Sequence, residues 1–317
     1  MKIFRREFLK SILSWAFAKS ALGGAFMSKV DDEKKVLYSY TVKDRHWVGD
    51  GFYVHGLLRP SEKLNKHISP FILMDYASPK EFSSTTSRRG VGEHPHRGFE
   101  TVTFAYQGEV EHRDSSGGGG VIKAGDVQWM TAGSGVVHDE FHSTDFSKRG
   151  GVFEMVQLWV NLPKKDKMTK PKYQGIKSES IPVCKIGEHS HCRVFAGEFE
   201  GKKGPASTFT KINMYDIYGE KSDHLHINIP KNTNTILLVL KGKITHQSKE
   251  YDEQNILIFD RQGDELEFKT SNNFKALLLN GEPINEPIFA HGPFVMNTRE
   301  EIIQAIDDFQ KGKMGRL

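Results

Sequence analysis

Four side chains in the first half of the chain have the types and the spacing of a metal-binding set. His94 and His96 are separated by one residue, and His138 and Glu140 repeat that spacing further along the chain. Alternate side chains of a strand share a face, so each pair can present two ligands to one interior. Pro95 favours an extended backbone at His94, which supports this arrangement. Three neutral imidazoles and one carboxylate suit a divalent first-row metal ion with coordination positions left open.

Two further groups raise the question of additional ligands. A second His-x-His pair, His224 and His226, has no downstream His or Glu at the matching place, so we interpret it as non-ligating. Glu100 and His142 share strand parity with the ligand candidates, and each could therefore face the same interior. The pattern does not decide whether Glu100 and His142 bind the metal ion or lie beside its ligands.

The segments that must position these residues are predicted to be strands. Thirty glycines and twelve prolines among 317 residues indicate many turns, which is typical of an all-β protein. Short runs rich in β-branched and aromatic residues lie between turn residues. They cover 37–41, 71–75, 100–106, 109–113, 126–130, 153–160, 192–196, 212–218, 235–240, 255–259 and 274–279.

The chain is long enough for two domains. Residues 163–180 are polar and basic with two prolines, and they are predicted to link two halves. Strand–glycine–strand segments at 104–110 and 238–244 are similar, and this weak internal repeat predicts two copies of one β-barrel. Residues 298–310 predict one helix, because Thr298 can cap it and its apolar residues share a face.

The first 28 residues predict an export signal. Arg5 and Arg6 precede Phe-Leu-Lys and an apolar stretch, which is the pattern of a twin-arginine signal. The stretch is short and is broken by Lys19, so no stable membrane span is expected. We therefore expect a periplasmic or exported protein, or a cytoplasmic one if the segment is a retained amphipathic helix. Residues 29–36 are charged and are predicted to be a solvated linker.

The charge distribution argues against a nucleic-acid partner. The formal net charge is +4, and the first 28 residues supply this excess with five basic residues against one acidic residue. The body of the chain is therefore close to neutral, without the basic surface that nucleic-acid binding requires. Cys184 and Cys192 could form one disulfide in an oxidising compartment or remain two thiols, and both alternatives stay open.

Two motifs resemble those of the pirin family, within the cupin superfamily. Gly-Glu-His-Pro-His-Arg-Gly-Phe-Glu-Thr-Val-Thr at 92–103 resembles the first metal motif, and the segment from Gly125 to Glu140 resembles the second. Shorter similarities occur at 157–163, 165–168, 196–198 and 292–301, and the resemblance runs from Tyr38 to Phe309. It implies a bicupin, in which two jelly-roll barrels (double-stranded β-helices) are followed by a short C-terminal helix.

The resemblance also implies which residues form each barrel and which barrel holds the metal ion. We expect the metal-binding barrel over residues 37–170 and the second barrel with the helix over 171–317, with metal in the first barrel alone. It makes His94, His96, His138 and Glu140 the ligands of one divalent ion, with Fe(II) expected and Cu, Ni, Mn or Co as alternatives. It places Glu100 beside the ligands rather than among them. Pirins usually carry Met-Pro where this chain has Phe141-His142, so the mouth of the site is expected to differ.

Some bacterial pirins are similar to quercetin 2,3-dioxygenases, so the resemblance implies a dioxygenase that acts on flavonols. Glu140 would be both ligand and base, taking the proton of the flavonol 3-hydroxyl before dioxygen attacks and carbon monoxide leaves. The expected partners are a small phenolic substrate and dioxygen, and the expected state is a monomer. Candidate aromatic walls are Phe99, Trp129 and Phe141, whereas Phe104 fits ordinary barrel core better. The alternative is a non-catalytic, metal-containing regulatory, sensor or binding protein.

Overall fold

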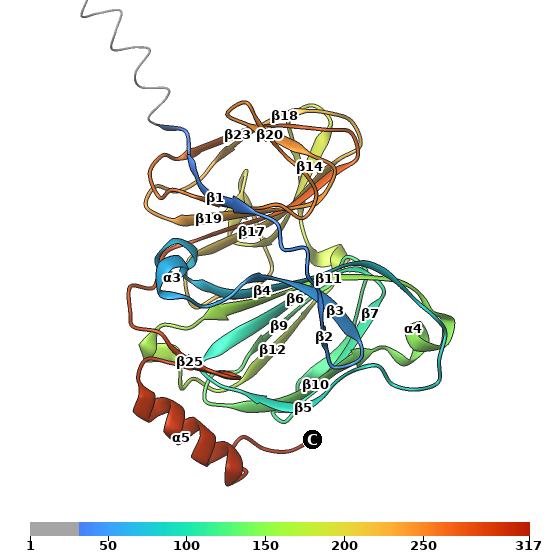
Figure 1. Ribbon diagram of the computed structural model, residues 1–317, viewed down its shortest axis with the longest axis vertical. Coiled ribbons are helices and arrows are strands. Elements are labelled where there is room, and N and C mark those ends of the chain that lie inside the picture. Colours follow the sequence, from blue (N-terminus) through green and yellow to red (C-terminus); the bar gives the residue numbers. More distant parts are fainter. Residues whose placement is uncertain (1–31) are drawn as a thin grey trace, which may run out of the picture.

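Figure 1 shows the computed structural model, which describes residues 32–317 as two stacked β-barrels with a helix beside the first. The predicted all-β bicupin fold with a short C-terminal helix is confirmed. The predicted signal at residues 1–28 lies outside the described residues. Within the described part of the chain, none of the helices is long and apolar enough to cross a membrane.

The first barrel consists of two facing antiparallel sheets. Its strands are β2 (His46–Val48), β3 (Phe52–Leu58), β4 (Phe71–Phe82), β5 (Gly90–His96), β6 (Phe99–Gln107), β7 (Glu109–Asp114), β8 (Gly119–Lys123), β9 (Val127–Thr131), β10 (Val136–His142), β11 (Gly151–Asn161) and β12 (Lys172–Ile176). The larger sheet has the order β12-β9-β6-β11-β4-β3-β2, and the smaller has the order β5-β10-β7-β8. Short helices α3 (Glu62–Ile68) and α4 (Thr144–Arg149) lie in the connections.

The second barrel repeats this plan. Its strands are β1 (Val36–Tyr40), β13 (Val183–Ile186), β14 (Ser190–Ala196), β17 (Ile212–Gly219), β18 (His224–Asn228), β19 (Asn234–Lys241), β20 (Ile244–His246), β21 (Lys249–Tyr251), β22 (Ile256–Phe259), β23 (Glu265–Thr270) and β24 (Phe274–Gly281), with a small hairpin of β15 (Glu198–Phe199) and β16 (Lys202–Lys203). The larger sheet has the order β1-β22-β19-β24-β17-β14-β13, and the smaller has the order β18-β23-β20-β21.

The interior of the second barrel is filled with apolar side chains. On β18, Leu225 and Ile227 point into this interior and are fully buried. His224 and His226 alternate with them and therefore point outward, where they are exposed and pair with glutamates of β23. Neither histidine belongs to a group of potential metal ligands in the described part of the chain. This placement supports the non-ligating interpretation of the pair.

The two larger sheets pack face to face and form the main core between the barrels. Phe104 of β6 packs on Phe195 of β14, with ring centroids 5.1 Å apart. Trp129 of β9 lies in the same core and is fully buried. The prediction of Phe104 as core is confirmed. The prediction of Trp129 as a pocket wall is wrong, because its strand turns this side chain toward the second barrel.

Each end of the described chain packs on the barrel formed by the other half of the sequence. The predicted division into residues 37–170 and 171–317 is therefore corrected at both ends. Strand β1 pairs antiparallel with β22 and thus belongs to the second barrel (Figure 1). At the other end, β25 (Phe289–His291), β26 (Phe294–Met296) and α5 (Arg299–Gln310) return to the first barrel. The ion pair between Arg97 and Asp308, 2.9 Å long, fixes α5 there. The cap predicted at Thr298 is confirmed, and Thr298 forms a capping box with Glu301.

The segment predicted as a linker, 163–180, contains strand β12, which pairs with β9 at the edge of the larger sheet. Its residues Lys172 and Gln174 are exposed or half-buried. An edge strand with one solvated face carries few apolar residues, so its pattern resembles that of a linker.

Cys184 and Cys192 lie directly opposite each other on β13 and β14, and both are free and buried. Burial raises the pKa of the Cys192 thiol. We expect neither thiol to react with a disulfide reagent in the native protein, because the nucleophile is the exposed thiolate. Titration with such a reagent in denaturant should then recover both thiols. Rapid native reaction, or no thiols in denaturant, would contradict this expectation.

Candidate metal centre

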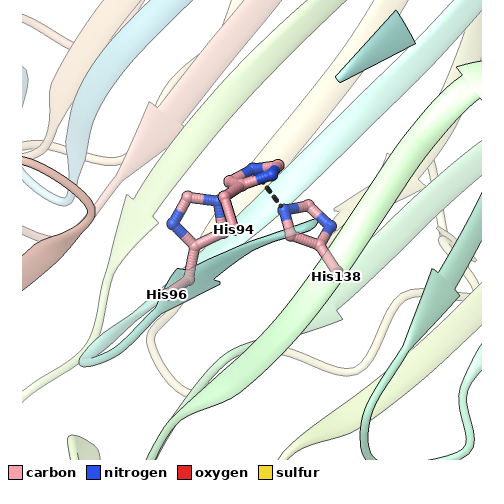
Figure 2. Close-up of side chains that lie close together, drawn as sticks. All are labelled: His94, His96 and His138. Atoms are coloured by element: carbon pink, nitrogen blue, oxygen red, sulfur yellow. Dashed lines mark hydrogen bonds between the residues drawn. The ribbon is translucent and has the colours of Figure 1, made fainter. Parts of the chain in front are cut away.

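The three predicted histidines meet at one end of the first barrel, on the paired strands β5 and β10. His94 and His138 are direct partners across the two strands. Their Nε2 atoms lie 2.8 Å apart, and Figure 2 shows the three rings turned toward one another. The ring of His96 lies 4.7 Å from that of His138 and 4.8 Å from that of His94, centroid to centroid. The predicted convergence of these histidines is therefore present in the structure.

Backbone carbonyls determine which nitrogens are free on two of these rings. The Nδ1 atom of His94 lies 2.8 Å from the carbonyl oxygen of Gly92, and Nδ1 of His96 lies 3.4 Å from that of Pro293. A carbonyl oxygen only accepts, so each Nδ1 carries the hydrogen and each Nε2 keeps its lone pair. These lone pairs point to the shared space beside His138. A donor set of this kind fits a divalent first-row metal ion.

The electrostatics keep the buried members of the cluster neutral. His96 is 4% exposed and His138 is 0% exposed, whereas His94 is partly open to solvent. Burial, followed by the neighbouring imidazoles, lowers the pKa of both His96 and His138 well below the ordinary value. Neutral imidazole is the form that binds a metal ion, so no proton has to be displaced at pH 7.

Glu140 is the next inward residue of β10 after His138, and it is buried. Its carboxylate accepts hydrogen bonds from the side-chain amide of Gln128, from Nε2 of Gln157 at 2.8 Å, and from the hydroxyl of Thr103 at 3.5 Å. It belongs to a second, overlapping group with His112 and His138 rather than to the group of three histidines. The structure therefore places Glu140 beside the cluster and oriented toward two glutamine amides.

Glu100 is not beside the ligands. Phe99 of β6 contacts the ring of His96, so its neighbour Glu100 lies on the opposite face, where it accepts a hydrogen bond of 2.7 Å from Thr131. Burial raises the pKa of Glu100 to about 7. The expectation that Glu100 lies beside the ligands is therefore wrong. The alternation of side chains does not continue from His96 to Glu100, because the turn at Gly98, with a φ of 86°, reverses the chain between β5 and β6.

His142 points into the barrel but lies beyond the site, in its apolar end. Its ring stacks on Phe153 with centroids 4.5 Å apart, and its Nε2 donates to the carbonyl of Gly51 at 2.9 Å. It belongs to neither group of potential ligands in the described chain. The preceding residue, Phe141, alternates outward and lies under the guanidinium of Arg88 at 3.7 Å. Neither residue contacts the three histidines.

The aromatic wall of the cluster is formed by Phe99 and Trp159. Their ring centroids lie 5.0 Å and 5.2 Å from that of His96, and 4.2 Å from each other. Phe99 was among the predicted wall residues, whereas Trp159 was not. Residues that the sequence pattern did not indicate are His112, Gln128, Gln157 and Trp159. No local sequence pattern indicates the first three, because the register across strands brings them to the site: His112 lies opposite Glu140, and both glutamines lie opposite Thr103.

Comparisons with known proteins agree with this architecture. Residues 54–160 match the family described as Pirin, and residues 214–315 match the Pirin C-terminal cupin domain. A Pseudomonas aeruginosa protein, named provisionally as a quercetin 2,3-dioxygenase, is 48% identical over 89% of this chain and 99% of its own length. A pirin-like protein of Solanum lycopersicum is 37% identical over 84% and 88%.

The crystal structure of a quercetin 2,3-dioxygenase from Acinetobacter baumannii superimposes on this chain with a TM-score of 0.85. That protein is 51% identical, and the match covers 89% of this chain and 99% of the other. The two barrels and their order in the chain are thus shared along nearly the whole described length.

Proposed function

The chain belongs to the pirin family, and on that premise we propose that it is a metal-dependent dioxygenase that acts on flavonols such as quercetin. The observation that carries the proposal is the convergence of three histidines next to the Glu140 carboxylate inside the first barrel. The relatives from Pseudomonas aeruginosa and Acinetobacter baumannii, which carry quercetin 2,3-dioxygenase names, support the substrate class.

The Nε2 atoms of His94, His96 and His138 would hold the metal ion, with Glu140 as the fourth protein ligand or as a base beside it. Imidazole and carboxylate donors suit Fe(II), which we propose first, and also Ni, Cu, Mn or Co. When bound, such an ion supplies Lewis-acid chemistry at a substrate oxygen and redox chemistry for dioxygen.

Glu140 would accept the proton of the flavonol 3-hydroxyl. Its Oε1 atom already accepts from Gln128 and Thr103, whereas Oε2 accepts only from Gln157. Oε2 is therefore the atom with free capacity for the proton. Phe99 and Trp159 offer flat apolar faces beside His96 for the aromatic rings of the substrate. In the overall reaction both atoms of dioxygen enter the products, and one ring carbon leaves as carbon monoxide.

The test is turnover by metal-loaded protein. Full-length protein loaded anaerobically with Fe(II) should bleach quercetin absorbance in air, with equal amounts of flavonol and dioxygen consumed and carbon monoxide released. The metal-free protein is the control and should be inactive. No consumption of several flavonols with Fe, Ni, Cu, Mn or Co would refute the dioxygenase. The alternative function, a metal-containing sensor or binding protein, would then be favoured. It is supported by the three hydrogen bonds that the Glu140 carboxylate already accepts from protein side chains.

A further inference from the structure

A buried histidine–aspartate pair lies behind the metal cluster, on the side of His138 that faces away from His94. Strand β7 runs antiparallel to β10, with Asp114 opposite His138 and His112 opposite Glu140. The side chains of His112 and Asp114 are both 0% exposed, and Nε2 of His112 lies 3.2 Å from Oδ2 of Asp114. This pair has no role in the proposed reaction, yet it is enclosed in the same barrel.

The carboxylate of Asp114 has a fixed orientation. Its Oδ1 atom accepts three hydrogen bonds: from the hydroxyl of Ser116 at 2.6 Å, from the backbone N–H of Ser116 at 2.8 Å and from that of Gly118 at 3.0 Å. This leaves Oδ2 to accept from His112. A carboxylate only accepts, so Nε2 of His112 carries the hydrogen and Nδ1 of His112 keeps a lone pair.

That lone pair determines the tautomer of His138. The Nδ1 atoms of His112 and His138 lie 3.3 Å apart, so His138 must donate the hydrogen from its own Nδ1. Its Nε2 then keeps a lone pair that meets the lone pair of His94 Nε2 at 2.8 Å, a contact that is favourable when both nitrogens bind one metal ion. The His112 ring is held in place by stacking on Tyr173, with centroids 4.9 Å apart and planes 20° apart. One hydrogen-bonded chain thus runs from Asp114 through His112 to His138.

We propose that Asp114 and His112 are positioning residues that hold His138 in the tautomer able to bind a metal ion, and so set the metal affinity of the site. The inference rests on the proposed metal site but not on flavonol chemistry. Partners behind a ligating histidine typically change metal affinity by ~10- to 100-fold when they are mutated. The competing assignment is that His112 itself is a ligand together with His138 and Glu140.

The variant Asp114→Asn tests the direction of the chain. The three donors at Oδ1 should retain the amide oxygen at that position, which turns the amide N–H₂ toward Nε2 of His112. His112 must then carry its hydrogen on Nδ1, and His138 must carry its own on Nε2, where it blocks metal binding. We expect the affinity for Ni(II), measured by competition with a chelator, to fall ~10- to 100-fold.

Asp139→Asn is the matched control. Asp139 lies between His138 and Glu140 on β10, its side chain is 3% exposed, and it pairs with Arg113 of β7 on the opposite face of the same two strands. This variant also removes one enclosed carboxylate, but it leaves the chain behind His138 intact. Its Ni(II) affinity should therefore match that of the wild type. An equal loss in both variants would overturn the proposal in favour of a general effect on the barrel.

The tautomer itself provides a second readout that needs no metal. In metal-free wild-type protein with nitrogen-15 histidine, NMR should show the hydrogen of His112 on Nε2, where it is donated to Asp114, and Asp114→Asn should move it to Nδ1. A wild-type His112 with its hydrogen on Nδ1 would overturn the proposal, even if the variant fails to fold. If the wild type binds no Ni(II), the proposed metal site fails, while the tautomer result still decides the role of Asp114. If the variant keeps wild-type affinity and tautomer, the proposal is wrong.

Discussion

Replacing His138 with alanine is expected to abolish stoichiometric metal binding. His138 is the most enclosed of the three histidines, and it is shared by both groups of potential ligands. Binding free energies of about 10–16 kcal/mol for four-ligand zinc sites correspond to about 3 kcal/mol per ligand, or on the order of a hundredfold in affinity. A site reduced to two imidazoles should lose its ion during dialysis. Elemental analysis after dialysis, with circular dichroism to verify the fold, measures the result.

The second barrel provides a matched control for this loss. His226 belongs to a His-x-His pair with the spacing of His94 and His96, but it is about half exposed on the outer face of β18. His226→Ala should retain the metal content of the wild type. If His138→Ala also retains it, the ion lies elsewhere and the cluster of Figure 2 is not the site.

Replacing Glu140 with glutamine is expected to lower flavonol turnover by about 100- to 10,000-fold, the usual contribution of a general base. The amide has nearly the same shape, but it cannot accept a proton. The three histidines converge without a carboxylate oxygen among them, so the variant should keep most of its metal. Turnover with quercetin, normalised to metal content, separates the base from the ligand role. A proportional loss of metal and turnover would instead identify Glu140 chiefly as a ligand.

Glu100→Gln is the control for this change. Glu100 is also buried in the same barrel, and its carboxylate also accepts a hydrogen bond from a threonine. However, it lies on the face of β6 that points away from the histidine cluster. Its replacement should leave turnover per metal ion unchanged. A comparable loss in both variants would show that the effect of Glu140→Gln reflects the barrel rather than proton transfer.

The part of the site that could be predicted follows the alternation of a single strand. His94 and His96 on β5, and His138 and Glu140 on β10, each lie on one face because nothing interrupts the strand between them. The repeated spacing predicted one site for both pairs, and the bicupin resemblance supported that prediction. The same rule failed between His96 and Glu100, because the turn at Gly98 separates two strands and restarts the alternation.

Residues from other strands could not be predicted in this way. His112 and Gln157 reach the cluster through the pairing of β7 with β10 and the position of β11 in the larger sheet, and that register depends on the whole fold. The crossed chain ends were also missed. Strand β1 and helix α5 have the patterns of ordinary elements, and a local pattern does not state which barrel an element joins.

The return of the C-terminal segment to the first barrel has a consequence for the order of events during synthesis. The carbonyl of Pro293 faces Nδ1 of His96, and the buried ammonium of Lys167 links the carbonyls of Gly98 and Val295. A nascent chain presents all four predicted ligands long before these partners leave the ribosome. The histidine cluster therefore gains these neighbours only after residues 293–295 have been synthesised, so we expect a growing chain that lacks them to bind a metal ion more weakly than a chain that contains them.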